Sequence, residues 1–145
     1  DEITPQQQSS LEIAENISTW SKDPSTQIAA IAVKDKRLIA TGYNGFPRNI
    51  EDLDDRWNNR EEKYKYVVHA EMNCIYNANY HNQSLKGATM YVVGLPVCHE
   101  CAKGIVQVGI KRVVAQYVDA PLKWAKSTAI TEKMFKEAGI IYDQV

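Results

Sequence analysis

The sequence has little of what would mark a membrane, fibrous or strongly charged protein. No apolar run approaches the roughly 20 residues that a membrane-spanning helix needs, and there is no internal repeat or low-complexity tract. Seventeen basic and 18 acidic residues leave a net charge of −1. This balance gives no general basic field for a nucleic-acid backbone, so we expect a small substrate, with neither nucleic acid nor membrane as a partner.

Cysteine is also scarce. The three cysteines are an odd number, which excludes a fully paired disulfide framework, and two of them lie close together as Cys98 and Cys101. The N-terminus is polar and shows no signal-peptide pattern. We therefore expect a reducing compartment, the cytoplasm (of the host cell for a viral chain). The 145 residues, 44% of them hydrophobic, fit a single domain over 1–145 with its own core.

Two short segments combine to predict a metal site. The first is His69-Ala70-Glu71, and the second is the Cys98-x-x-Cys101 pair after Pro96-Val97. One imidazole and two thiolates are zinc ligands, and a helix N-terminus at the cysteine pair would favour thiolate. Three protein ligands leave a fourth position for water, which zinc makes acidic near neutral pH. Glu71 is close enough to His69 to act on that water without binding the metal.

A structural zinc site with four protein ligands is the alternative. His99, Cys74 and His81 are the candidates for a fourth ligand. His99 lies between the two cysteines, where a helical turn would point it elsewhere, Cys74 suits a buried helix face, and His81 falls in a polar break. We therefore favour a catalytic site with Glu71 beside it.

Hydrophobic periodicity predicts alternating helices and strands. Thr4, Pro5 and Gln7 form a helix-start signal, and Trp20 is expected to close the apolar face of that helix. The further expected elements are strands at 28–33 and 38–41, a helix at 69–79, a strand at 88–94, a helix at 98–108, a strand at 111–115, a helix at 128–138 ended by Gly139, and a strand at 140–142. This order indicates an α/β fold in which helices cover both faces of a mixed sheet.

The segment Gly42-Tyr43-Asn44-Gly45-Phe46-Pro47 is predicted to be a tight turn with positive φ at Asn44-Gly45. A polar loop is expected from Arg48 to about Lys63, with Trp57 as an anchor. A connection of this length in a compact domain is usually functional or disordered.

Four segments resemble the deoxycytidylate (dCMP) deaminase family of the cytidine-deaminase-like superfamily. They are Ser21-Lys22-Asp23-Pro24-Ser25-Thr26-Gln27, Gly42-Tyr43-Asn44-Gly45-Phe46-Pro47, His69-Ala70-Glu71-Met72-Asn73 and Cys98-His99-Glu100-Cys101-Ala102-Lys103. The last three together are specific, and the resemblance covers nearly the whole chain. One departure is that Val97 intervenes between Pro96 and Cys98, where the family usually has Pro directly before the first cysteine.

The resemblance implies a three-layer fold with a five-stranded sheet between helices, and zinc on His69, Cys98 and Cys101. It implies that Glu71 shuttles a proton from the attacking water to N3 of cytosine and then helps ammonia leave. It also implies the substrate contacts: the Ala70 backbone N–H for the base carbonyl, Asn44 for the deoxyribose, Tyr117 as an aromatic wall, and Ser21, Lys22 and Thr26 for the 5′-phosphate.

By the same resemblance we expect conversion of dCMP to dUMP and ammonia, which supplies dUMP for thymidylate synthesis. Relatives of this type are commonly hexamers, activated by dCTP and inhibited by dTTP with a divalent cation, so Mg²⁺ with a nucleoside triphosphate is expected at an effector site. Gly42, Tyr43 and Gly45 are the residues that the resemblance places there.

Two alternatives remain from the sequence. One is a related nucleoside or tRNA adenosine deaminase, although the tRNA enzymes have a much shorter interval between the positions of Asn44 and His69. The other is a non-catalytic module that keeps zinc for folding and binds nucleotides. Glu71 argues against the second, because a structural site does not need that carboxylate.

Overall fold

Five strands form one mixed sheet in the computed structural model, which describes residues 3–145. The strands are β1 (Ala29–Lys34), β2 (Arg37–Tyr43), β3 (Thr89–Val93), β4 (Arg112–Gln116) and β5 (Ile141–Gln144). Their spatial order is β2-β1-β3-β4-β5. β1 is antiparallel to both β2 and β3, whereas β3, β4 and β5 are parallel. The predicted mixed five-stranded sheet is confirmed.

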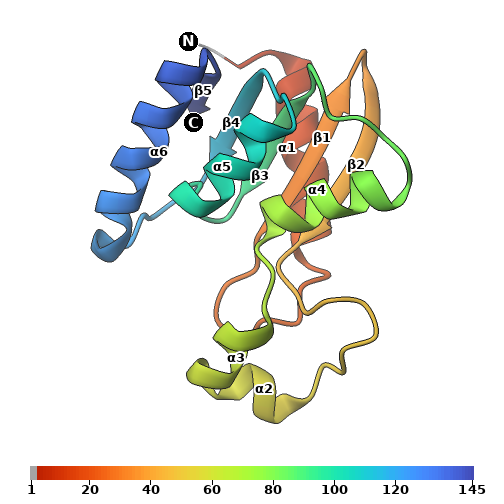
Figure 1. Cartoon of the computed structure of the whole chain (residues 1–145), viewed down its shortest axis with the longest axis vertical. Coiled ribbons are helices and arrows are strands. Elements are labelled where there is room, and N and C mark those ends of the chain that lie inside the picture. The colour runs from red at the N-terminus through yellow and green to blue at the C-terminus, as the bar shows by residue number, and fades with distance from the viewer. Residues whose placement is uncertain (1–2) are drawn as a thin grey trace.

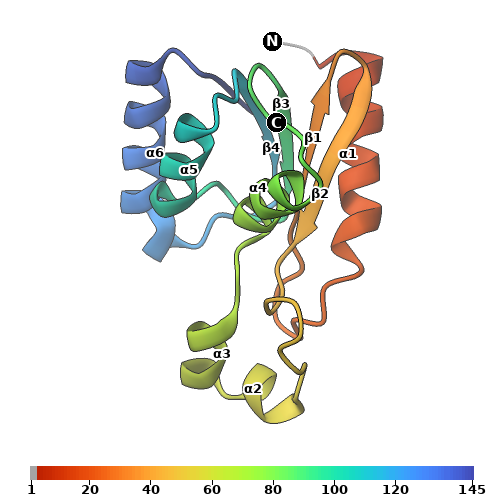
Figure 2. The same cartoon turned by 45° about the vertical axis from the view of Figure 1, so that its right-hand side comes forward.

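Helices cover both faces of this sheet (Figures 1 and 2). The helices are α1 (Pro5–Ser18), α2 (Asp54–Asn58), α3 (Arg60–Tyr66), α4 (Ala70–Tyr80), α5 (His99–Gln107) and α6 (Ala125–Ala138), with a 3-10 turn at Leu122–Trp124. One cluster of buried side chains joins α1 to the sheet, and a larger cluster on the opposite face joins it to α4, α5 and α6. The predicted three-layer α/β/α architecture is therefore confirmed.

The start of α1 follows from its sequence. The Thr4 hydroxyl accepts a hydrogen bond from the Gln7 backbone N–H, and the Gln7 side chain accepts one from the Thr4 backbone N–H. These reciprocal bonds satisfy two backbone donors at the helix start. Trp20 does not close the buried face as predicted, because α1 ends at Ser18 and the Trp20 ring, 61% exposed, packs edge-on against Tyr43.

Small side chains let α4 approach the sheet closely. Ala70, Cys74 and Ala78 form one row along the helix and are almost fully buried. The row meets β2 at Gly42, where an added Cβ would come within 2.2 Å of the Cys74 backbone nitrogen. The position of α4, and with it the position of His69 at its N-terminus, therefore depends on the absence of a side chain at Gly42.

The interval predicted as a loop from Arg48 to about Lys63 contains the short helix α2 and the start of a second one, α3. The Asn59 side chain accepts a hydrogen bond from the Glu62 backbone N–H and so caps α3. Trp57, predicted as an anchor, is 6% exposed and stacks on Phe46 with 4.1 Å between ring centroids. The sequence prediction missed these helices because each is too short to show helical periodicity.

The predicted tight turn at Asn44-Gly45 is also wrong. Neither residue has a positive φ, and the chain bends at Asn44 before Gly45 bridges to Val68 in an antiparallel pair. The Asn44 side chain accepts a hydrogen bond from the Ile28 backbone N–H. A bridge between two distant segments of the chain and the buried Asn44 amide, rather than local turn chemistry, therefore determine the conformation of this segment.

None of the helices in residues 3–145 combines the length and the apolar character needed to cross a lipid bilayer.

We predict that Gly42→Ala lowers the free energy of unfolding by about 3 kcal/mol, because overpacking against a helix backbone displaces α4. Gly45→Ala is the matched control, because its added Cβ would meet only the Tyr43 side chain, at 3.4 Å. Urea denaturation followed by circular dichroism measures both. Equal midpoints for the two variants would contradict this account of the α4–β2 contact.

Candidate active site

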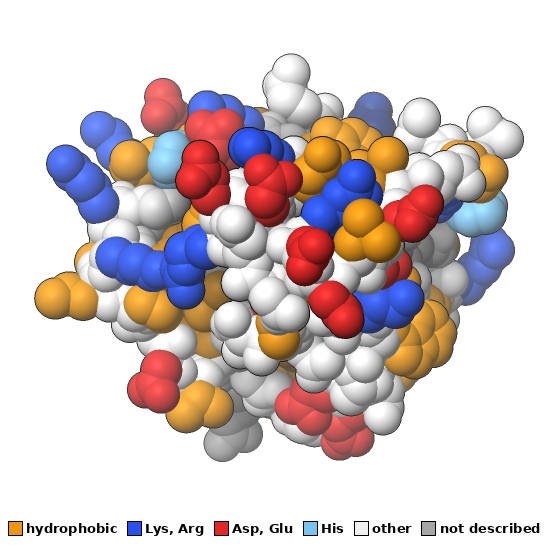
Figure 3. Space-filling view, turned by 90° about the horizontal axis from the view of Figure 1, so that it is seen from below, with side chains coloured by type: hydrophobic (Ala, Val, Ile, Leu, Met, Phe, Trp, Pro, Cys, Tyr) orange, Lys and Arg blue, Asp and Glu red, His pale blue; other side chains and the backbone are white. Residues whose placement is uncertain are grey.

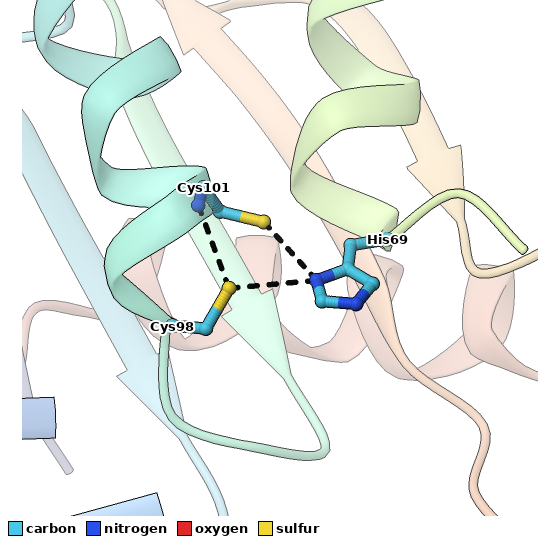
Figure 4. A group of neighbouring side chains, drawn as sticks. All are labelled: His69, Cys98 and Cys101. Atoms are coloured by element: carbon cyan, nitrogen blue, oxygen red, sulfur yellow. Dashed lines mark hydrogen bonds between the residues drawn. The ribbon is translucent and has the colours of Figure 1, made fainter. Parts of the chain in front are cut away.

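His69 lies at the N-terminus of α4. It is the residue before the helix, with an extended backbone, and Glu71 follows in the first turn. α4 covers the same face of the sheet as α5, and the N-termini of the two helices lie side by side (Figures 1 and 4). This arrangement directs the His69 ring towards the start of α5.

Cys98 and Cys101 occupy the start of α5. Cys98 is the N-cap residue, and its Sγ accepts a hydrogen bond from the Cys101 backbone N–H at 3.4 Å. One helical turn separates the two residues, so both sulfurs face His69 (Figure 4). The prediction that both halves of the motif lie at helix N-termini is therefore confirmed.

The three side chains converge on one point. His69 Nδ1 lies 3.5 Å from Cys98 Sγ and 3.3 Å from Cys101 Sγ. Ligands of a tetrahedral zinc ion with ordinary bond lengths would have an N···S separation of about 3.6 Å. The donor set and its spacing therefore fit zinc, with one position left for a small ligand.

The fourth-ligand candidates lie elsewhere. Among residues 3–145 the metal-ligating group consists of His69, Cys98 and Cys101. His99 Nδ1 lies 2.8 Å from the Ser127 hydroxyl on α6, Cys74 is fully buried on the sheet-facing side of α4, and His81 is exposed at the end of that helix. This arrangement matches an open site better than a four-ligand structural site.

Val97, the departure from the family pattern, is accommodated by burial. Its side chain is fully buried. Its carbonyl accepts a hydrogen bond from the Thr131 hydroxyl at 2.9 Å, and its N–H donates to the Tyr142 hydroxyl at 3.4 Å. The turn before Cys98 is thus held by α6 and β5, and the spacing of the two cysteines is kept.

Glu71 is a buried carboxyl beside this group. It is 5% exposed, and burial raises its pKa to about 7, with a further contribution from the charge of Cys98. A carboxyl group that titrates near neutrality can both accept and return a proton. Glu71 lines the same cavity as His69 and Cys98, so it faces the space next to the converging ligands.

The two thiols differ in their electrostatics. The hydrogen bond from Cys101 and the contact with His69 lower the pKa of Cys98, whereas the same shared hydrogen bond and burial raise the pKa of Cys101. The hydrogen bond with Cys98 raises the pKa of His69. Binding of zinc requires two thiolates and a neutral imidazole, so it must release protons from this cluster.

One cavity is lined by His69, Glu71 and Cys98 together with residues from three other parts of the chain. Its walls come from the segment before β1, from α3, and from the chain before α6. The lining residues are Asp23, Ser25, Thr26, Ile28, Asn44, Arg60, Lys63, Tyr64, Val67, His69, Glu71, Leu95, Pro96, Cys98, Pro121, Lys123 and Trp124. Two members of the metal-ligating group, His69 and Cys98, therefore lie in the wall of a larger pocket, of the kind that a nucleotide-sized molecule needs.

The predicted substrate residues are not all in this cavity. Thr26 and Asn44 line it. The Asn44 amide also donates to Asp23 Oδ2 and to the Thr26 carbonyl. Ser21 is buried and donates to the Asn44 carbonyl, and Lys22 forms an exposed ion pair with Asp52 at 3.2 Å, so neither lines the cavity.

Tyr117 and Ala70 also lie outside the lining. The Tyr117 hydroxyl donates to the Gln144 side chain on β5, the strand next to β4, which directs the ring along the sheet edge. Ala70 is fully buried as the first residue of α4, where a backbone N–H has no acceptor within its own helix. The aromatic residues that line the cavity are Tyr64 and Trp124.

Sequence reasoning missed the cations of the cavity. Arg60 and Lys63 come from α3, and Lys123 comes from the turn before α6. The only sequence signal was the long charged interval before His69, which was predicted to be functional or disordered. Figure 3, which views the face below α2 and α3, shows acidic and basic side chains interspersed. The cations are therefore a local feature of the cavity.

Two of the three residues predicted for an effector line a second cavity. Tyr43 and Gly45 line it, together with Arg48, Asn73 and other residues between β2 and α4. Gly42 is buried against α4 and does not line it. This second cavity is separate in its lining residues from the one that holds His69.

Comparison with known proteins places this geometry in a family. A family model described as the cytidine and deoxycytidylate deaminase zinc-binding region matches residues 4–117. An uncharacterised deaminase of Aliivibrio fischeri is 37% identical over 132 residues, 90% of this chain and 86% of that protein. The deoxycytidylate deaminase of Mus musculus is 38% identical over 128 residues, 84% of this chain and 69% of that protein.

A solved structure agrees in fold. The dCMP deaminase from the cyanophage S-TIM5, in complex with dCMP and dUMP, superposes with a TM-score of 0.79 at 23% identity and covers 99% of this chain and 100% of that one. The chain belongs to the cytidine and deoxycytidylate deaminase family. It is a hydrolytic deaminase of the zinc-binding class, and the His/Cys/Cys group fits the metal that this class binds.

We predict one zinc per chain, lost in Cys98→Ala and retained in Cys74→Ala. The variants are matched because both remove a buried thiol, but only Cys98 lies within ligand distance of His69. Elemental analysis of the purified proteins measures the metal. Loss of zinc from Cys74→Ala, or from His99→Ala, would instead indicate a four-ligand structural site.

Proposed function

We propose that the chain deaminates dCMP to dUMP and ammonia, with residues 1–145 as one catalytic domain. The observation that carries this proposal is the buried carboxyl of Glu71 beside the His69, Cys98 and Cys101 group, in a cavity that cations also line. The deoxycytidylate deaminase name of the mouse relative supports the choice of substrate.

His69, Cys98 and Cys101 would hold zinc, which when bound acts as a Lewis acid on water. Glu71 takes a proton from the attacking water and delivers it to N3 of cytosine. A C–O bond forms at C4, the C4–N bond breaks, and Glu71 helps to protonate the amine that leaves as ammonia. One carboxyl serves as base and then as acid, which suits a pKa near 7.

The remaining contacts orient the nucleotide. The Ala70 backbone N–H, at the first position of α4, is placed to donate to the base carbonyl. We assign the deoxyribose end to the segment around Asn44 and Thr26. Arg60 and Lys123 are cations of the cavity and suit a 5′-phosphate better than Ser21 or Lys22, whose side chains are engaged elsewhere; Lys63 lines the same cavity but is paired with Asp23.

The two alternatives have less support. A nucleoside or tRNA adenosine deaminase would share the metal ligands, but this chain has a long interval between Asn44 and His69, and that interval supplies α3 as a cavity wall. A non-catalytic zinc module would have no use for a buried carboxyl facing the metal group. Desolvating Glu71 costs stability, which is a typical feature of a catalytic group.

Regulation and assembly form a further part of this proposal. We propose that the cavity lined by Tyr43 and Gly45, beside Gly42, takes dCTP as activator and dTTP as inhibitor with Mg²⁺, in a homo-oligomer of six chains. Arg48 in its lining suits a triphosphate. The cytoplasm is the proposed compartment, because the unpaired Cys98 and Cys101 must stay reduced to bind metal, and dUMP would serve thymidylate synthesis.

Glu71→Gln is expected to keep its zinc and to lose at least about a thousandfold in kcat, because the amide fills the same space but cannot shuttle a proton. Elemental analysis and an ammonia-release assay measure the two properties. Glu100→Gln is the control, since Glu100 is an exposed glutamate of α5 paired with Lys103. Retained turnover in Glu71→Gln would favour the non-catalytic module.

The wild-type enzyme is expected to prefer dCMP to deoxycytidine by about a hundredfold in kcat/KM, because the nucleoside leaves the cations of the cavity unpaired. The ammonia-release assay on dCMP, deoxycytidine, CMP and dCTP tests this preference. The same assay with added dCTP or dTTP and Mg²⁺ tests regulation. Turnover of deoxycytidine without turnover of dCMP would overturn the assignment of the substrate.

A further inference from the structure

Asp23 is a buried carboxylate in the wall of the cavity that the chemistry above does not use. Its side chain is 3% exposed. Oδ1 accepts hydrogen bonds from the backbone N–H groups of Ser25 and Thr26, at 2.8 and 3.3 Å. Oδ2 accepts one from the Asn44 amide at 3.2 Å and pairs with Lys63 Nζ at 2.8 Å. Asp23 thus joins three segments that line the cavity.

Lys63 contributes the only one of these links that comes from α3. Its side chain is 14% exposed, so the pair is largely shielded from water and from salt. A second lysine of the same helix, Lys65, pairs with Glu62 at 2.6 Å, but that pair is 57% and 38% exposed. Lys63 therefore lies on the inner face of α3 and Lys65 on its outer face. Exposed ion pairs such as Lys65–Glu62 contribute little to stability.

Apolar packing holds α3 only in part. Within residues 3–145, α3 has no residue that counts as buried, and α2 contributes only Trp57. The Tyr66 ring contacts Phe46 with 5.9 Å between centroids, near the point where the chain returns to the sheet. Both helices lie below the layers of the fold rather than against them (Figures 1 and 2). A segment with so little buried surface depends on its polar links for a fixed position.

The position of α3 matters because this helix is a wall of the cavity. Arg60, Lys63 and Tyr64 of α3 line the same cavity as His69 and Glu71. A shift of the helix by about 1 Å would change the distance between its cations and a bound phosphate, and displacements of this size affect binding and turnover strongly.

We propose that the Asp23–Lys63 ion pair fixes α3 as the cationic wall of the cavity and thereby sets the preference for a substrate with a phosphate at its 5′ end. The inference rests on the proposed function for the identity of that substrate. Asp23 and Lys63 act here as positioning residues, with Arg60 as the cation that they place.

The test compares Lys63→Met, Asp23→Asn and their double variant with the wild type. Lys63→Met keeps the volume and removes the charge, and Asp23→Asn keeps the oxygen that accepts from Ser25 and Thr26. Each is expected to raise KM for dCMP about tenfold, with kcat within about threefold and KM for deoxycytidine unchanged. Hydrogen exchange of the amides of residues 60–66 is expected to become faster, with zinc content unchanged.

The double variant should be no worse than either single one, because both remove the same interaction. Lys65→Met is the matched control on the outer face of α3 and should match the wild type in KM and in exchange. Lys63→Arg, which keeps the charge, should restore most of the substrate preference.

Three outcomes would overturn the proposal. They are exchange in Lys63→Met equal to that in Lys65→Met, additive effects in the double variant, or a higher KM without faster exchange, which would make Lys63 a direct contact. If the wild type does not turn over dCMP, the proposed function fails, and the exchange comparison still decides whether the ion pair positions α3.

Discussion

The convergence of two helix N-termini on one point is the constraint on which the rest of the structure depends. Three donor atoms at the starts of α4 and α5 must lie within about 4 Å of one another to share one zinc ion. α4 can reach that position only because β2 offers Gly42, with no side chain, to the row of small residues on the helix. A backbone contact near the end of the edge strand β2 therefore determines the geometry of the metal-ligating group.

The same packing places Glu71 out of water. A carboxyl in the first turn of a helix would normally ionise easily, because the positive end of the helix dipole favours its charge. Here burial is the larger effect and raises its pKa to about 7. This desolvation weakens the fold, and it gives a single side chain that can accept a proton and return it during one reaction.

The cavity wall that α3 supplies is built differently. α4 and α5 are held by apolar clusters on the sheet, whereas α3 lies outside these clusters and is linked to the segment before β1 through Asp23. A rigid chemical centre thus faces a wall held mainly by polar contacts. Residues that discriminate between substrates commonly lie on such segments, because changes there leave the core unaffected.

The sequence by itself determined the order of the main helices and strands, the mixed sheet with helices on both faces, the α1 capping box, and the pairing of His69 with Cys98 and Cys101. These features follow from local periodicity, from capping chemistry and from the spacing of metal-binding residue types. Through the resemblance, the sequence also indicated five strands, the family and the role of Glu71.

Only the tertiary structure decided which side chains share the cavity. Tyr117 was predicted to line the cavity, but its hydroxyl donates a hydrogen bond to Gln144, because β5 pairs with β4. Pairing between strands that are distant in the chain cannot be predicted from local sequence. Lys22 and Lys63 are both lysines in polar segments, yet one meets the exposed Asp52 and the other the buried Asp23. Neighbours far apart in the chain, rather than residue type, set the surroundings of a charged side chain, and these neighbours exist only in the folded protein.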